Sequence, residues 1–227
     1  MSSLSKRRLS VPESGPESMP ELGPESGCAA VILAAGDSSR LGQPKQLVQV
    51  RGESLLRRTA RMAAESGCDP VVVVLGFEAK RMRSELDGLR ATAIVNEGWC
   101  EGMGSSLRRG VSALMKVDAR PRNALLLVCD QVALSSDFLS ELLRVHSSAP
   151  GSGRGPVGAG ITAAQYAGRL GVPAVFPAAL FPELMAVEGD WGARAILEAR
   201  ASQVTAVDFP GGELDLDTPE QLGALGG

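Results

Sequence analysis

The segment LAAGDSSRLGQPKQL, residues 33–47, combines glycines with positive charge directly after an apolar run. Gly36 and Gly42 allow a ligand to approach the main chain closely because they carry no side chain. Arg40 and Lys45 add two positive charges to the same segment. Backbone N–H groups of a glycine-containing loop that follows a strand bind phosphates in many α/β proteins. The segment is therefore predicted to bind phosphate groups.

The spacing of these residues excludes two common kinds of phosphate loop. Neither the GxxxxGK[ST] pattern nor the GxGxxG pattern is present, so the segment is neither a Walker loop nor a dinucleotide fingerprint. An ordinary strand-to-helix connection with surface cations is the alternative interpretation. Such connections usually span only about 2–6 residues, and the length of this segment favours a binding loop.

Carboxylates that follow later apolar runs are candidate metal ligands. Asp130 ends the run 123–130, and Asp215 and Asp217 alternate with leucines in ELDLD. A carboxylate that faces phosphates recruits Mg²⁺, which takes one or two carboxylates together with phosphate oxygens. Asp130 could instead cap the turn that follows it, and one of the other two could lie on the outer face of an edge strand. Of those two, Asp217 is the better candidate because it lies at a strand-to-helix junction.

An alternation of apolar runs and amphipathic segments predicts the elements that position these residues. PVVVVLG at 70–76 is a continuous β-branched run, which is typical of a strand covered on both faces. The segment 54–67 places apolar residues on one face of a helix that Gly67 closes. The sequence predicts strands over 28–34, 70–76, 91–95, 123–130, 169–176, 203–209 and 212–217, and helices over 54–67, 77–87, 104–117, 135–146, within 187–201 and from 218 onward.

This alternation indicates an α/β fold with a doubly wound, mostly parallel sheet in three layers. In such a sheet the first and fourth strands are neighbours, so their carboxyl ends flank one crevice. We therefore expect Asp130 to face the loop at 33–47. Asp190 and either Ser135 or Ser136 are predicted to cap helices, and His146 is expected to interact with the last carbonyls of its helix.

The composition agrees with one folded domain and a tail. Of the 227 residues, 44% are hydrophobic, 22% charged and 4% aromatic, as is normal for a protein that buries a sizeable core. Residues 1–27 repeat PES and PEL with glycines and prolines and are predicted to be disordered. Residues 28–227 are then the folded domain, in which the glycine-rich stretch 149–160 is predicted to form a mobile loop.

Charge and residue usage exclude several classes of function. A net charge of −3 argues against a protein that binds nucleic acid or an anionic membrane surface, and no apolar run approaches the ~18–20 residues that cross a bilayer. The four cysteines lie far apart without a CxxC pair, and the single histidine excludes a multi-histidine metal site. The tail lacks the apolar stretch of a secretory signal, so a cytoplasmic location is expected.

The loop at 33–47 resembles the LAAGxSxRxGxPKxL signature of the molybdopterin nucleotidyltransferases, a family of the MobA-like NTP transferase type, and is similar to its cytidylyltransferase branch. The resemblance spans residues 28–222 and implies a Rossmann-like sheet of the nucleotide-diphospho-sugar transferase type. It implies transfer of CMP from CTP to the terminal phosphate of molybdopterin or molybdenum cofactor, with release of pyrophosphate and with Mg²⁺ as cofactor. The later matching blocks are NEGWCEGMGSSLRRG (96–110), CDQ (129–131), GVPAVF (171–176), GDWGAR (189–194) and DLDTPEQL (215–222).

The resemblance also assigns roles to individual residues. Arg40, Lys45 and Asp130 are implied to be catalytic, with the two cations neutralising phosphate charge. Asp130 and Asp217 are implied to hold the metal ion. The implied nucleotide-binding residues are Leu33, Ala34, Ala35, Gly36, Ser38, Ser39, Arg40, Lys45, Asn96 and Ser105; the implied acceptor-binding residues are Gly171, Asp190 and Arg194, of which the last two could equally be a helix cap and a surface arginine.

Two departures from the family pattern bear on the site. Val132 stands where the family usually has a proline after CDQ, which loosens a turn but leaves Asp130 in place. Val172 stands where the family often has a histidine, in GHP, so a contact on the pterin side is expected to be missing. The departures therefore affect the acceptor side more than the nucleotide side.

Three alternatives to this function stay open on the sequence. The first is a nucleotidyltransferase with GTP as donor or with another phosphorylated acceptor. In the family that the loop resembles, guanylyl-transferring members tend to read LAGG and cytidylyl-transferring members LAAG, so LAAG at 33–36 favours CTP by this resemblance. The second is a non-catalytic maturation chaperone that binds the cofactor and hands it on. The third, a flavodoxin-like or NAD-binding module, lacks its glycine fingerprint. The expected partners are CTP, molybdopterin-type small molecules, and a molybdenum hydroxylase of the xanthine dehydrogenase type or its chaperone.

Overall fold

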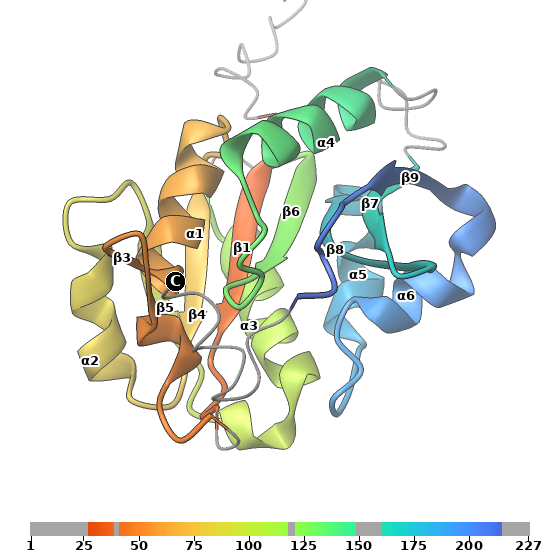
Figure 1. Cartoon of the computed structure of the whole chain (residues 1–227). Coiled ribbons are helices and arrows are strands. Elements are labelled where there is room, and N and C mark those ends of the chain that lie inside the picture. Colours follow the sequence, from red (N-terminus) through yellow and green to blue (C-terminus); the bar gives the residue numbers. More distant parts are fainter. Residues whose placement is uncertain (1–26, 39–40, 118–120, 149–159, 215–227) are drawn as a thin grey trace, which may run out of the picture.

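A central sheet of seven strands organises the protein (Figure 1). The computed structural model describes residues 27–38, 41–117, 121–148 and 160–214. The strand order across the sheet is β5-β4-β1-β6-β8-β7-β9. The strands are β1 (Ala29–Ala34), β4 (Val71–Leu75), β5 (Thr92–Val95), β6 (Asn123–Val128), β7 (Ile161–Tyr166), β8 (Arg169–Pro177) and β9 (Val204–Asp208); β2 (Gln49–Val50) and β3 (Glu53–Ser54) form a separate antiparallel pair.

The sheet is mostly parallel, as the sequence predicts. β5, β4, β1 and β6 run parallel in adjacent positions. β8 is antiparallel to both β6 and β7, and β9 returns parallel to β7. The order β5-β4-β1-β6 places the fourth predicted strand beside the first, so the doubly wound α/β fold is confirmed.

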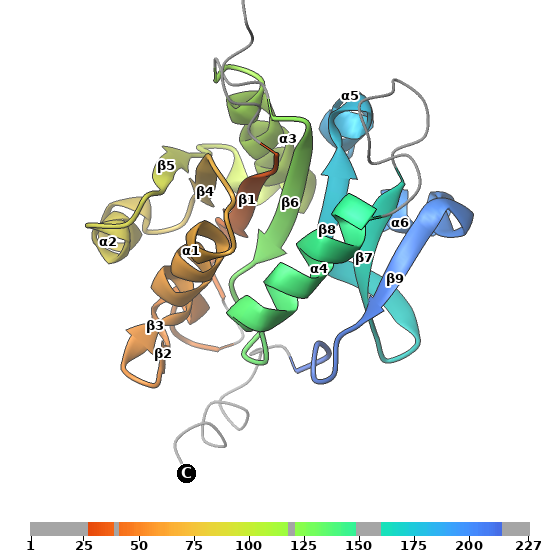
Figure 2. The same ribbon diagram turned by 90° about the horizontal axis from the view of Figure 1, so that it is seen from above.

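Helices cover both faces of the sheet in a three-layer arrangement. Figure 2 shows α1 and α4 on one side and α3, α5 and α6 on the other. The helices are α1 (Leu55–Glu65), α2 (Ala79–Arg83), α3 (Met103–Leu114), α4 (Ser136–Ser148), α5 (Phe181–Met185) and α6 (Arg194–Ala199), with 3-10 turns at Lys45–Leu47, Ser84–Leu86, Trp99–Glu101, Ala178–Leu180 and Ala201–Gln203.

The alternation of side chains along β1 produces two cores. Ala30 and Ile32 pack with the helices α1 and α4, whereas Ala29 and Val31 pack with α3. Both cores exclude water from the strand, and β4 is likewise buried at all five of its positions. This double burial explains why the two strands read as unbroken apolar runs.

Local capping chemistry sets two of the helix boundaries. Ser54 Oγ accepts a hydrogen bond of 3.2 Å from the Arg57 N–H at the start of α1, and Gly67 follows this helix with φ +88°. Ser135 Oγ accepts one of 3.1 Å from the Phe138 N–H before α4. The predicted cap at Ser135 is therefore confirmed.

Two local predictions are wrong, and one strand was missed. Asp190 does not cap a helix, because α6 begins at Arg194 after Ala193, and residues 211–213 form a turn where a strand was expected. The strand β7 was not predicted, because its alanine-rich sequence has weak β-propensity. Some predictions lie outside the described residues: the predicted tail over 1–26, the predicted mobile loop over 149–159, the end of the predicted last strand at 215–217 and the helix predicted to start at 218.

His146 has a structural role that differs from the predicted one. It lies in the last turn of α4 and is 4% exposed, and its Nδ1 lies 3.1 Å from Thr162 Oγ1 on β7. Burial lowers the pKa of His146, which favours the neutral ring. The side chain joins the helix to the sheet.

None of the helices in the described ranges is both long enough and apolar enough to span a membrane.

Gly110 is the contact point between α3 and the sheet, and it provides a test of this packing. A Cβ at this position would overlap Val31 Cγ1 and lie 3.0 Å from Val74 Cγ2. Gly110→Ala is therefore expected to lower the free energy of unfolding by about 1–3 kcal/mol, although the same change in an open helix usually stabilises by roughly 0.5–1 kcal/mol. Chemical denaturation measures the difference, with Ser112→Ala on the same helix as the control. Combining Gly110→Ala with Val31→Ala should recover part of the loss; additive losses would contradict this packing.

Candidate functional site

Two neighbouring strand ends bring the predicted catalytic residues together. Leu33 of β1 is in register with Val128 of β6, so the loop after β1 and the residues after β6 meet at one edge of the sheet. Lys45 Nζ lies 2.5 Å from Asp130 Oδ2 across this edge. The expectation that Asp130 faces the loop is confirmed.

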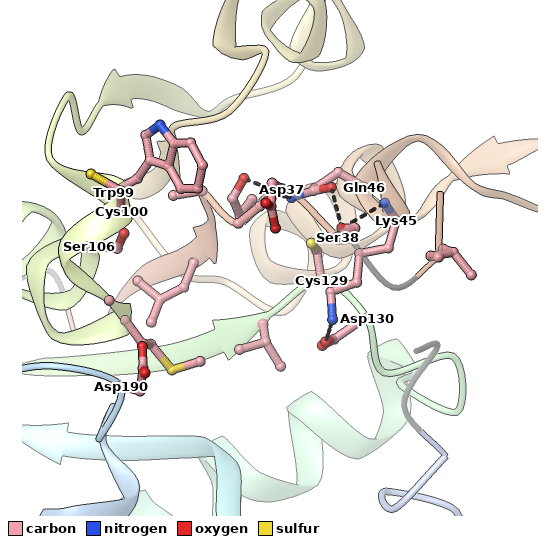
Figure 3. A pocket seen from close by; sticks show the side chains of 18 residues that line it. Asp37, Ser38, Lys45, Gln46, Trp99, Cys100, Ser106, Cys129, Asp130 and Asp190 are labelled. Atoms are coloured by element: carbon pink, nitrogen blue, oxygen red, sulfur yellow. Dashed lines mark hydrogen bonds and ion pairs between the residues drawn. The ribbon is translucent and has the colours of Figure 1, made fainter. Parts of the chain in front are cut away.

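A cleft of about 430 Å³ opens at this edge (Figure 3). Lys45 and Asp130 lie on one side of it, and Trp99 and Asp190 lie across from them. Most of the predicted nucleotide-binding residues of the loop line the cleft. Its full lining is Leu33, Ala34, Ala35, Gly36, Asp37, Ser38, Leu41, Lys45, Gln46, Trp99, Cys100, Gly102, Met103, Ser106, Val128, Cys129, Asp130 and Asp190.

Gln46 fixes the conformation of the loop. Its side chain is 1% exposed, and its Nε2 donates hydrogen bonds to the carbonyl oxygens of Ala34 at 3.2 Å and Gly36 at 2.7 Å. In a trans peptide the N–H of the next residue points opposite to the carbonyl. The N–H groups of Ala35 and Asp37 therefore point away from the Gln46 side chain.

Ser38 closes the same loop at its other end. Its backbone has φ +54°, a left-handed conformation that reverses the chain. Ser38 Oγ accepts a hydrogen bond of 3.1 Å from the Lys45 N–H and donates one of 3.4 Å to Gln46 Oε1. These bonds hold Lys45 at the point from which it reaches Asp130.

Asn96 and Ser105 hold the opposite wall of the cleft and do not belong to its lining. Asn96 Nδ2 donates to Ser105 Oγ at 2.8 Å and to Ser106 Oγ at 3.1 Å. Ser105 Oγ in turn donates to the carbonyls of Gly98 and Gly102, each at 2.9 Å. The network ties the segment after β5 to the start of α3, and the nucleotide-binding role predicted for the two residues stays a prediction.

Asp130 has the donor atoms that a divalent metal ion needs. Its Oδ1 is buried and has no hydrogen-bond partner among the described residues, while Oδ2 meets Lys45. A hard cation that takes one or two carboxylates plus phosphate oxygens fits such an oxygen. The described residues contain no cluster of three or more histidine, cysteine or acidic side chains that could hold a metal alone. Asp217, the second predicted ligand, lies outside them.

Cys129 precedes Asp130 but is not a candidate nucleophile. Burial, reinforced by the neighbouring Asp130 carboxylate, raises the pKa of the Cys129 thiol to about 12. The thiol therefore stays protonated at neutral pH, and the reactive form of cysteine is the thiolate. The charge chemistry of this edge thus rests on Lys45 and Asp130 among the described residues.

A second cleft of about 500 Å³ adjoins the first and contains all three predicted acceptor-binding residues, Gly171, Asp190 and Arg194. The two linings have Leu33, Met103, Val128, Asp130 and Asp190 in common. The two clefts therefore meet at Asp130. The second lining also includes Gln131, Tyr166, Arg169, Leu170, Val172, Trp191, Gly192 and Ala193.

The structure adds cleft residues that the sequence interpretation missed. Gln46 follows Lys45 directly inside the quoted PKQL motif, and Trp99 lies inside NEGWCEGMG, so the available signal was their place within these segments. Tyr166 lies on β7, which was not predicted, and Arg169 was placed only at the start of the predicted strand 169–176 without a role in the site. Two predicted residues, Ser39 and Arg40, lie outside the described residues.

Comparison with known proteins identifies the family. The model of the MobA-like NTP transferase domain matches residues 30–205. The chain belongs to this family. Among its relatives, this MobA-like protein is 36% identical to a protein named nicotine blue oxidoreductase from Paenarthrobacter nicotinovorans, over 85% of this chain and 93% of the relative. It is 30% identical to the purine catabolism protein PucB of Bacillus subtilis, over 84% and 92%.

Other relatives and solved structures agree with this membership. A probable molybdenum cofactor guanylyltransferase of Opitutus terrae is 33% identical over 52% of this chain and 55% of that protein. The crystal structure of Rv0371c from Mycobacterium tuberculosis superposes with a TM-score of 0.70 at 30% identity, covering 89% of this chain and 98% of that one. A further structure of Rv0371c is a complex with manganese. A nucleotidyl transferase of Methanothermobacter, at 21% identity and a TM-score of 0.71, shares the fold.

Lys45→Ala tests the phosphate-facing cation. Removing one protein group that stabilises charge in a transition state usually lowers turnover by about 10²–10³-fold. We therefore expect the rate of pyrophosphate release to fall by at least this factor. Lys80→Ala, which removes an exposed lysine on α2, is the matched control, and circular dichroism checks the fold. A Lys45→Ala protein with the wild-type rate and nucleotide affinity would contradict the phosphate-loop assignment.

Asp130→Asn tests the metal site. The amide keeps the shape of the side chain but removes the negative charge that attracts a hard cation. We expect weaker Mn²⁺ binding in the presence of nucleotide, measured by electron paramagnetic resonance, and loss of metal-dependent turnover. Asp208→Asn, at the end of β9, is the control and should bind Mn²⁺ like the wild type. Unchanged Mn²⁺ affinity in Asp130→Asn would move the metal to other ligands.

Proposed function

We propose that this protein transfers CMP from CTP to the terminal phosphate of molybdopterin or molybdenum cofactor and releases pyrophosphate. The observation that carries the proposal is the junction of two adjoining clefts at Asp130, with Lys45 beside it. A transferase needs two substrates that meet at one point, and it needs charge to neutralise phosphates there. Membership of the MobA-like family supports the same reaction class.

The chemistry requires little of the protein beyond position and charge. An anionic oxygen of the acceptor phosphate forms a bond to the α-phosphorus of CTP, and the bond from that phosphorus to the bridging oxygen breaks. Pyrophosphate leaves with the electron pair of the broken bond. Because the attacking oxygen is already an anion at neutral pH, no general base is needed, and positioning and electrostatic stabilisation supply the catalysis.

The residues of the first cleft have distinct parts in this proposal. The loop that holds Ala35 faces the nucleotide phosphates, and Lys45 neutralises their charge. Asp130 would hold Mg²⁺, which would offset the negative charge of the phosphates when bound. The manganese complex of Rv0371c supports divalent metal binding in the family. Arg40 and Asp217 keep their proposed roles as the second cation and the second metal-side carboxylate.

Ala35 carries the proposed preference for CTP. It is 6% exposed, and its carbonyl accepts a hydrogen bond of 3.0 Å from the Phe77 N–H. The Ala35 methyl group and Trp99 both lie close to Gly76, because a Cβ built on Gly76 would lie 2.8 Å from Ala35 Cβ and 2.7 Å from Trp99 Cβ. The Ala35 methyl group therefore fills the wall of the cleft beside Trp99. A glycine at position 35 would widen this wall, and the methyl group therefore favours the smaller pyrimidine ring.

A second candidate function is an oxidoreductase, because the relative with 36% identity is named nicotine blue oxidoreductase. An oxidoreductase that uses a nicotinamide dinucleotide would have to bind it without the GxGxxG fingerprint. The meeting of Lys45 and Asp130 between two clefts favours the transferase. The proposed recipient of its product is a molybdenum hydroxylase of the xanthine dehydrogenase type or its chaperone.

A screen of nucleotides against acceptors tests the proposed function. CTP, GTP and ATP are each mixed with molybdopterin or with a sugar phosphate, and pyrophosphate is measured. We expect kcat/KM for CTP with molybdopterin to exceed that for GTP by about tenfold or more, which corresponds to ~1.4 kcal/mol of transition-state binding. NADH oxidation, followed in parallel, should be absent.

The variant Ala35→Gly extends this screen. We expect it to reduce the ratio of CTP to GTP turnover, while Ala113→Gly on α3 leaves the ratio unchanged. A wild-type protein that prefers GTP would overturn the cytidylyl assignment but not the roles of Lys45 and Asp130. NADH oxidation without pyrophosphate release would favour the oxidoreductase instead.

A further inference from the structure

The second cleft carries an arginine whose charge no described carboxylate neutralises. The side chains in its described lining that are charged at neutral pH are Asp130, Arg169, Asp190 and Arg194. Asp130 meets Lys45, and Arg194 Nε donates to Glu198 Oε1 at 2.7 Å. Within the described ranges, Arg169 forms no ion pair. It is therefore the cation of this cleft that is available to an anionic ligand.

Arg169 is held by an aromatic ring and not by a carboxylate. Its guanidinium carbon lies 5.7 Å from the centre of the Tyr166 ring. The two residues are cross-strand partners at the end of β7 and the start of β8. Ala167 and Gly168 between them have φ +48° and +73°, as in a tight two-residue hairpin turn. Contact with a ring face leaves the guanidinium N–H groups available as donors.

A series of aromatic contacts fixes Tyr166 in turn. Its ring meets Phe209 edge to face, with centres 6.0 Å apart, and Phe209 stacks on Phe138 of α4 at 4.2 Å. Phe209 is 3% exposed, so the support of Tyr166 lies in the core. On its other side, a Cβ at Gly171 would overlap the Tyr166 hydroxyl. The glycine predicted to contact the acceptor thus provides the space that Tyr166 occupies.

We propose that Arg169 binds a phosphate monoester group of the acceptor in the second cleft and that Tyr166 is its positioning residue. This inference rests on the proposed function. The planar guanidinium donates two parallel hydrogen bonds to a phosphate. A phosphate that enters this cleft also meets the carboxylates of Asp130 and Asp190, so it needs a cation of its own. Arg169 supplies that charge from the start of β8, in the same lining as Asp130 and Asp190.

Binding of a matched pair of probes tests the role of Arg169. The probes are 6-hydroxymethylpterin and its monophosphate, added to full-length protein saturated with CMP, which occupies the nucleotide cleft. Equilibrium dialysis, read by pterin fluorescence, gives a dissociation constant for each. We expect the wild type to bind the phosphorylated probe about tenfold or more tightly than the other, and Arg169→Gln to abolish this ratio.

Control variants separate a specific contact from a general loss of charge. Arg144→Gln removes an exposed arginine of α4, outside both clefts, and should keep the ratio. Tyr166→Phe keeps the ring under the guanidinium and should keep most of the preference, whereas Tyr166→Leu should lower it. Thermal unfolding checks that each variant folds, and the affinity for CMP should stay unchanged in all of them.

The outcomes of this experiment are independent of turnover. A wild type that does not prefer the phosphorylated probe, or that binds neither probe, overturns the proposal, as does an Arg169→Gln protein that keeps the ratio. Failure of the proposed function has a different signature, namely no pyrophosphate from CTP and molybdopterin with the wild-type protein. The phosphate preference and its dependence on Arg169 can therefore stand even if the donor is another nucleotide.

Discussion

The ion pair between Lys45 and Asp130 is the interaction on which the site depends. Its two residues are 85 positions apart and approach to 2.5 Å because β1 and β6 are adjacent and parallel. Both side chains are partly shielded, at 22% and 16% exposure. Partial burial strengthens the attraction relative to a surface pair, and each charge would be costly to leave without the other. The pair keeps both charges at the cleft.

The order of strands determines which loops can cooperate. Four parallel strands bring their carboxyl ends to one edge, and the first cleft opens there. The reversal at β8, which runs antiparallel to β6, brings a different set of loops to the far side of Asp130. One half of the sheet thus supplies the proposed nucleotide cleft and the other supplies the proposed acceptor cleft, with Asp130 between them.

Close packing supports this arrangement where charge alone could not. Gln46 binds two carbonyls of the phosphate loop, and Asn96 binds two hydroxyls at the start of α3. These bonds are buried, so each one lost would leave a polar group without a partner. Gly102 and Gly104 let the same segment approach residues 187–190, since a Cβ at either position would overlap the backbone there. These contacts tie together the wall of the first cleft that carries Trp99 and Asp190.

The sequence by itself determined the parallel half of the fold and the position of a loop with glycines and cations after its first strand. The apolar runs of β1, β4 and β6 and the residues from Leu33 to Leu47 are local signals, and strand order follows from the general topology of such sheets. The tertiary structure alone decided that Asn96 supports a wall, that Asp190 lies in a cleft and not at a helix cap, and that Tyr166 carries Arg169. These features depend on contacts between distant segments, and β7 has no strong pattern of its own. Periodicity reports which face of an element is buried, but it does not report which side chains meet there.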